Sequence, residues 1–160
     1  MSILFNSESF FNVKRTKDGS FFLPLIGSGA KKGLSVSINS LSVGDMQELW
    51  EKYRDRGLVV LGVPSNSFNQ EKTKNNEVKE FCEVNFNINF PLTEITDVKG
   101  DNSHEIYRWA KENYGKSAVP KWNFYKILIN KEGKIEETYA SLTNPTSKKI
   151  IKRIESLLTV

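Results

Sequence analysis

Residues 57–64 read Gly57-Leu-Val-Val-Leu-Gly-Val-Pro64, an apolar run closed by a glycine at one end and a proline at the other. No polar residue interrupts the run, which is the pattern of a strand covered on both faces. Strands of that kind occur in parallel sheets, whose two faces are covered by helices. The stretch therefore predicts a buried strand over 58–63 with a parallel neighbour in an α/β domain.

The residues before this strand supply the helix and the partner strand that such a sheet needs. Four apolar residues of the segment 45–55 fall at helical spacing, which predicts an amphipathic helix with Gly57 as its C-cap. Farther upstream, residues 34–38 alternate between apolar and polar side chains, which predicts a strand. Together these segments form a βαβ unit.

Further elements extend the unit at both ends. Apolar segments 10–13 and 21–25 flank Lys17-Asp-Gly19, and the Asp-Gly pair predicts an N-terminal β-hairpin. The other expected elements are a helix over 76–85, a helix over 101–114 capped by Asn102 or Ser103, a hairpin of strands 124–129 and 134–139, and a closing helix over 147–158. This order predicts a thioredoxin-like α/β fold, with a mixed central β-sheet flanked by helices.

The composition restricts the class of protein. A chain of 160 residues suits a single domain, 1–160, that buries a core without disulfides or metal. Its one cysteine, Cys82, has no partner for an internal disulfide, so we expect a reducing, cytoplasmic setting. The sequence contains neither a signal-like N-terminus nor an apolar run of about 18 residues, so we expect no membrane insertion. The net charge of +4 is spread among mixed charges, which argues against nucleic-acid binding.

Several short motifs follow one another along the chain. They are Tyr53–Asn66 with its Pro-x-Asn turn, Glu80-Phe-Cys82, Asn89-Phe-Pro91, Val98–Trp109 with His104, and Trp122-Asn-Phe124. From about Phe10 to Leu158 the chain resembles the glutathione peroxidase family, particularly its bacterial members. Five blocks in the expected order are far more specific than any one of them.

The resemblance implies an activity and a site. Members of that family reduce hydroperoxides with a thiol such as glutathione or thioredoxin, in the response to oxidative stress, and need no other cofactor. Gln, Trp and Asn side chains surround their peroxidatic cysteine or selenocysteine, and the N–H groups favour a thiolate and solvate the departing oxygen. By motif, Gln70, Trp122 and Asn123 match these three positions. The loop around Gln70 is shorter than the family's and lacks its glycines.

The fourth position, that of the nucleophile, holds no cysteine. The most economical gap aligns Leu34–Ser42 with the family's first core strand and catalytic turn, and it places Ser42 at the cysteine. Moving the gap places Ser37 there instead. Serine is barely ionised at neutral pH and has no counterpart to the thiol, sulfenic acid and disulfide series. The segment is also shorter than the family's, so the residues around the nucleophile differ as well.

Three functions follow from these residues. The first is a glutathione peroxidase family protein whose activity is lost or reduced because Ser42 replaces the cysteine. The second is residual thiol chemistry through Cys82, which is otherwise a small buried side chain of the helix over 76–85. The third is a non-catalytic binding or sensing module on the same scaffold. His104 is predicted to be a helix-cap or packing residue and not a catalyst.

Overall fold

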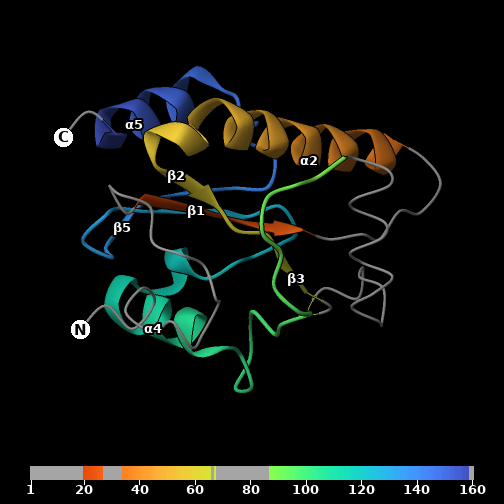
Figure 1. Cartoon of the computed structure of the whole chain (residues 1–160). Helices are drawn as coiled ribbons and strands as arrows, with labels where there is room; N and C mark the ends of the chain where they lie inside the picture. Colours follow the sequence, from red (N-terminus) through yellow and green to blue (C-terminus); the bar gives the residue numbers. More distant parts are fainter. Residues whose placement is uncertain (1–19, 27–33, 66, 68–86, 159–160) are drawn as a thin grey trace.

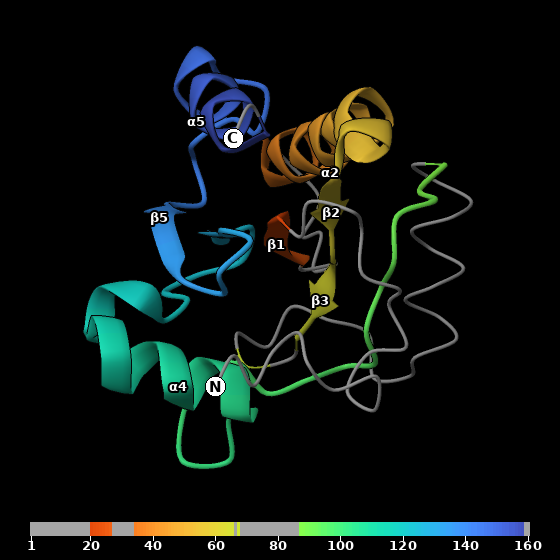
Figure 2. The same ribbon diagram turned by 60° about the vertical axis from the view of Figure 1, so that its left-hand side comes forward.

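The computed structural model of the chain describes residues 20–26, 34–65, 67 and 87–158. Its elements are β1 (Ser20–Ile26), α2 (Leu34–Tyr53), η1 (Arg54–Arg56), β2 (Leu58–Val60), β3 (Val63–Pro64), α4 (Glu105–Tyr114), η2 (Lys116–Ala118), β4 (Lys126–Ile129), β5 (Ile135–Tyr139) and α5 (Lys148–Leu158). Helices α2 and α5 lie together on one face of the sheet, and α4 lies on the other (Figures 1 and 2).

The sheet has the order β2-β1-β4-β5, and β3 pairs with the last residues of β1, farther along the same edge that pairs with β2. β1 runs parallel to β2 and β3 and antiparallel to β4, which is antiparallel to β5. The predicted buried strand with a parallel neighbour and the predicted C-terminal hairpin are therefore confirmed. Between β2 and β3, Gly62 bonds to an extended segment instead, because its N–H donates to the carbonyl of Pro91 at 2.8 Å and its carbonyl accepts from Thr93 at 2.9 Å.

The parallel neighbour is β1, and the strand predicted over 34–38 is wrong. Residues 34–38 form the first turns of α2, which continues through the predicted helix over 45–55 to Tyr53. A central strand covered on both faces favours a continuous apolar run. The segment 21–26 supplies such a run, whereas serine stands at every second position of 34–38. Alternation over five residues was too short a signal to separate a strand from a helix.

Only one arm of the predicted N-terminal hairpin, the segment 21–25 in β1, lies within the described residues. The segment 21–25 is a strand, as predicted, but it pairs with β2 and β3 on one side and with β4 on the other. The other predicted arm, 10–13, and the turn at 17–19 lie outside the described residues. The helix predicted over 76–85 lies outside them too.

Two clusters of buried side chains cover the two faces of the sheet. The α2/α5 cluster joins residues of both helices to the sheet and includes Val43, Met46, Leu49, Tyr53, Val60, Phe124, Leu128, Ile150 and Ile154. The α4 cluster includes Val59, Leu61, Val63, Ile106, Tyr107, Tyr125, Ile127 and Ile129. Along β4, Ile127 and Ile129 belong to the α4 cluster and Leu128, between them, belongs to the α2/α5 cluster, as expected for a strand buried on both faces.

The helix ends follow local hydrogen bonding. Nδ1 of His104 accepts a hydrogen bond from the backbone N–H of Ile106 at 3.3 Å, so His104 is the N-cap of α4 and its predicted cap role is confirmed. Asn102 and Ser103 are not the cap, because the backbone N–H of Ser103 belongs to the preceding turn and donates to Gly100 at 3.2 Å. Gly57 has φ 106 and ends η1, as predicted for a C-cap.

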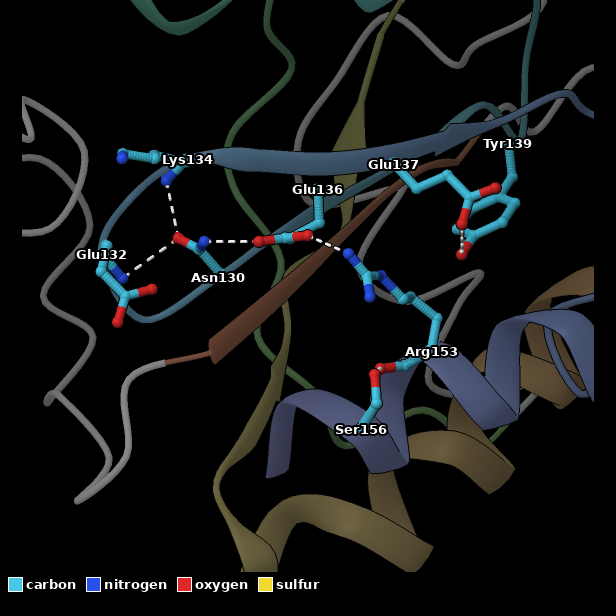
Figure 3. Close-up of polar contacts among 8 residues, drawn as sticks. All are labelled: Asn130, Glu132, Lys134, Glu136, Glu137, Tyr139, Arg153 and Ser156. Carbon is cyan, nitrogen blue, oxygen red and sulfur yellow. Dashed lines mark hydrogen bonds and ion pairs between the residues drawn. The ribbon is translucent and has the colours of Figure 1, made fainter. Parts of the chain in front are cut away.

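Helix α5 is fastened to the sheet through polar side chains on the β4–β5 hairpin (Figure 3). Arg153 of α5 pairs with Glu136 of β5. Glu136 also accepts a hydrogen bond from Nδ2 of Asn130 at 2.6 Å. Oδ1 of the same Asn130 accepts the backbone N–H groups of Glu132 at 3.1 Å and Lys134 at 2.9 Å. The predicted hairpin turn and the predicted closing helix are thus linked through one asparagine.

Candidate functional site

The Trp122-Asn-Phe124 motif lies between η2 and β4, directly before the strand that pairs with β1. Asn123 is 2% exposed, whereas Trp122 is 53% exposed. Phe124 has φ 59, in the left-handed region that aromatic residues rarely adopt. Such a backbone conformation costs on the order of 1–3 kcal/mol and persists where the surroundings enforce it, often at functional sites. The motif therefore exposes its indole and buries its amide on a strained turn.

Two aromatic side chains hold this turn in place. Phe124 belongs to the α2/α5 cluster, and Tyr125 belongs to the α4 cluster on the opposite face of the sheet. The hydroxyl of Tyr125 donates to the backbone carbonyl of Ser117, which ties the start of the strand back to η2. Burial of two large rings in two different clusters outweighs the local backbone preference at Phe124.

The turn at Ser65 and Ser67, which follows β3, is fixed against a second loop. Oγ of the buried Ser65 accepts the backbone N–H of Ser67 at 3.2 Å. Oγ of Ser67 in turn accepts the backbone N–H of Val98 at 3.1 Å, and the carbonyl of Pro64 accepts from Thr96 at 2.9 Å. The predicted site residue Gln70 follows this turn, but it lies outside the described residues, as does Cys82.

Ser42 and Ser37, the two residues aligned with the nucleophile, both lie inside α2. The predicted catalytic turn at the end of a strand is therefore wrong for this segment, because the backbone there is helical. Val43, directly after Ser42, belongs to the α2/α5 cluster, and so does Phe124, directly after Asn123. One buried cluster thus contains the immediate neighbours of two predicted site residues.

A buried amine stands close to the same motif and was missed at the level of sequence. Lys126 is 0% exposed, and its Nζ donates to the backbone carbonyls of Ser141 at 3.1 Å and Thr143 at 2.7 Å. Burial lowers the pKa of Lys126 to about 8, and the carboxylate of Asp45 opposes that shift. The signal in the sequence was a single lysine within the otherwise uncharged run 122–130, since lysine is almost never fully buried unless it is paired.

Within the described ranges, no group of three or more histidine, cysteine, aspartate or glutamate side chains is placed to hold a metal ion. No helix in the same ranges is long and apolar enough to cross a membrane. In and directly after the motif, the described residues include the exposed indole of Trp122, the buried amide of Asn123 and, three residues farther along the chain, the buried amine of Lys126.

Comparison with known proteins shows which family carries these motifs. The family model for glutathione peroxidase matches residues 36–111, from α2 into α4, and ends before Trp122. Glutathione peroxidase-like peroxiredoxin 2 of Saccharomyces cerevisiae is 37% identical over 119 residues, which cover 71% of this chain and 72% of the yeast protein. The chain belongs to the glutathione peroxidase family.

The likeness extends over most of the molecule. Glutathione peroxidase homolog BsaA of Halalkalibacterium halodurans is 37% identical over 139 residues, which cover 85% of this chain and 84% of that protein. The crystal structure of Trgpx in its apo form matches with a TM-score of 0.58 and 28% identity, over 88% of this chain and 81% of that one. The predicted glutathione peroxidase resemblance and thioredoxin-like α/β fold are confirmed. The roles assigned to Ser42, Gln70, Trp122, Asn123 and Cys82 stay predictions.

Proposed function

We propose that this glutathione peroxidase family protein has lost the cysteine-dependent reduction of hydroperoxides. In that reaction a thiolate sulfur attacks one peroxide oxygen and the O–O bond breaks. The sulfur becomes a sulfenic acid, and the other oxygen leaves as water or an alcohol. Thiol reductants then return the sulfenic acid to the thiol. A serine oxygen has no corresponding oxidised state, so the cycle has no first step.

The observation that carries the proposal is the place of the one cysteine. Cys82 belongs to the Glu80-Phe-Cys82 motif, far along the sequence from the segment aligned with the nucleophile. Serine fills the nucleophile position at either placement of the gap, Ser42 or Ser37. The loss therefore does not depend on which alignment is correct.

A series of cysteine variants tests the proposal. In a Cys82→Ser background, we expect the protein to form no sulfenic acid with hydrogen peroxide, as read by dimedone labelling and mass spectrometry. Ser42→Cys should restore a labelled thiol if that position lies at the remaining site, and Ser37→Cys serves as the matched variant for the other alignment. Peroxide-dependent turnover by the unaltered protein that the Cys82→Ser protein lacks would overturn the proposal, because the one thiol of the chain would then act as the nucleophile.

Residual chemistry at Cys82 is the alternative that this series separates. If Cys82 reacts, the unaltered protein forms a sulfenic acid and the Cys82→Ser variant does not. The rate of Cys82 alkylation against pH gives a second reading. A thiol that reacts slowly, with a pKa at or above the free value of about 8.5, removes the alternative.

A binding or sensing role is a second candidate function, supported by the exposure of Trp122. A large aromatic ring that is 53% exposed on an anchored turn is the kind of residue that recognition sites use. Glutathione and hydrogen peroxide are the first ligands to screen by thermal shift, with Trp122→Ala as the control. A shift that Trp122→Ala abolishes supports this role, and no shift with either ligand argues against it.

The single cysteine leads us to propose that the protein works in the reducing cytoplasm.

A further inference from the structure

The buried Lys126 stands where three parts of the fold meet. It lies on β4, opposite Pro24 of β1 and Tyr139 of β5. Its ammonium group reaches the loop between β5 and α5, where it donates to the carbonyls of Ser141 and Thr143. Because burying an ammonium group without partners is costly, these two acceptors are part of what keeps Lys126 inside the protein.

Asp45 of α2 joins the same group of side chains. It interacts electrostatically with Lys126 and accepts a side-chain hydrogen bond from Asn144. Oδ1 of Asn144 accepts both the backbone N–H and the hydroxyl of Thr146 at 2.7 Å, which shapes the turn before α5. The loop over 141–146 is therefore fastened to β4 through Lys126 and to α2 through Asp45.

Asp45 and Lys126 each lie close in sequence to a residue of the proposed peroxidase site. Asp45 lies three residues after Ser42 on α2, and Lys126 lies three residues after Asn123 at the start of β4. Oδ2 of Asp45 is buried and has no hydrogen-bond partner among the described residues. The Asp45 carboxylate is stabilised by the hydrogen bond from Asn144 and, to a smaller extent, by the positive charge of Lys126, so both residues contribute to holding α2 at this position.

We propose that Lys126 is a positioning residue that, with Asp45, fixes the segment of α2 after Ser42 against the strand that carries Trp122 and Asn123. The inference rests on the proposed function for the identity of the site. It does not require that any activity remains. Apolar packing alone would hold α2 on the sheet, whereas the attraction between Asp45 and Lys126 and the hydrogen bond from Asn144 to Asp45 also favour one placement of α2 along it.

The charged surroundings of Lys126 give the proposal a distinctive pH dependence. Asp45 and Glu48 face the region from α2, and Tyr139, bonded to Glu137, faces it from β5. Neither β1 nor residues 140–144 contain an ionisable side chain. The pKa of Lys126 is about 8 in the folded protein, below its ordinary value of 10.5. Between these pH values the unfolded chain binds a proton that the folded protein has released, so stability rises with pH.

The first test is the stability of the full chain by urea unfolding between pH 7 and pH 10. Relative to Lys126→Met, the unaltered protein should gain up to about a hundredfold in its folding equilibrium constant across this range. Lys134→Met makes the same change at an exposed lysine and should leave the gain intact. Asp45→Asn should move the onset of the gain below pH 8, because Asp45 raises the pKa of Lys126. An identical profile in Asp45→Asn would overturn the pairing, even if Lys126→Met does not fold.

The second test measures position directly and uses no peroxide. In the Cys82→Ser background, spin labels at Ser42→Cys and Trp122→Cys report the distance between the two halves of the site by pulsed electron resonance. We expect one narrow distribution, broadened at least twofold by Asp45→Asn or Lys126→Met and unchanged by Lys134→Met. An unchanged distribution in both core variants overturns the positioning role. Neither test measures peroxidase activity. The positioning role of Lys126 can therefore fail while the proposed loss of activity stands, and the reverse.

Discussion

The two halves of the proposed site are fixed in different ways. The Trp122-Asn-Phe124 half ends in Phe124 and is followed by Tyr125, and the rings of these two residues are buried in the two clusters on opposite faces of the sheet. The Ser37–Ser42 half lies in helix α2 and, by our proposal, no longer carries the nucleophile of the family. A motif that also anchors the core is retained for packing, whether or not its chemistry survives. Retention of Trp122 and Asn123 is therefore no argument for activity.

Removing the anchor of the first half should have the largest effect. Phe124→Ala deletes a ring that is 5% exposed, and we expect a loss of about 3–5 kcal/mol in the free energy of unfolding. Urea unfolding followed by circular dichroism measures it. Leu142→Ala, at a side chain that is 84% exposed, should change stability by less than about 0.5 kcal/mol. A similar small change for both variants would mean that packing does not hold the turn.

Splitting the motif should separate its structural residue from its surface residue. Asn123→Ala removes a buried amide, and we expect a loss of about 1–3 kcal/mol, because polar groups around it lose a partner. Trp122→Ala removes a ring that is more than half exposed, and we expect less than about 1 kcal/mol. The same unfolding measurement compares them. Equal losses would show that Trp122 packs as strongly as Asn123 and weaken its assignment to recognition.

The cap of α4 gives the smallest effect and lies away from both halves. Burial lowers the pKa of His104, so the unfolded chain takes up a proton before the folded protein does as the pH falls. The stability that neutral His104 contributes is present above pH 6.5 and is lost as the pH falls through its lower folded value. Protonation of Nδ1 also removes the acceptor for Ile106 N–H, so exchange of the Ile106 amide should become faster relative to that of an unstructured chain at the same pH as His104 becomes protonated. His104→Asn keeps a cap without titrating, and an unchanged pH profile in that variant would contradict this reading.

Much of the fold could be predicted because its decisive signals are local. The apolar run 58–63 predicts a strand covered on both faces, and Asn130–Gly133 predicts the tight turn of the C-terminal hairpin, where Gly133 has φ 78. The closing helix follows from its periodic isoleucines and leucines. These signals depend on neighbours in the sequence, so one chain is enough to read them.

The failures came where the outcome depends on distant partners. Residues 34–38 alternate like a strand, yet the place between β2 and β4 is taken by β1, so the segment is helical. Burial of Lys126 depends on carbonyls of Ser141 and Thr143, which lie 15 and 17 residues away. The exposure of Trp122 beside a buried Asn123 follows from the left-handed turn at Phe124, for which the sequence carries no glycine signal.

The most direct test of the account is steady-state turnover by the unaltered protein. Hydrogen peroxide and an organic hydroperoxide are each supplied with glutathione and with thioredoxin, and consumption of the reductant is compared with that of the Cys82→Ser variant. The account predicts that both proteins stay at the rate of the buffer alone, with all four combinations. Turnover at rates ordinary for a glutathione peroxidase, in either protein, would contradict the claim that the nucleophile half of the site has been lost.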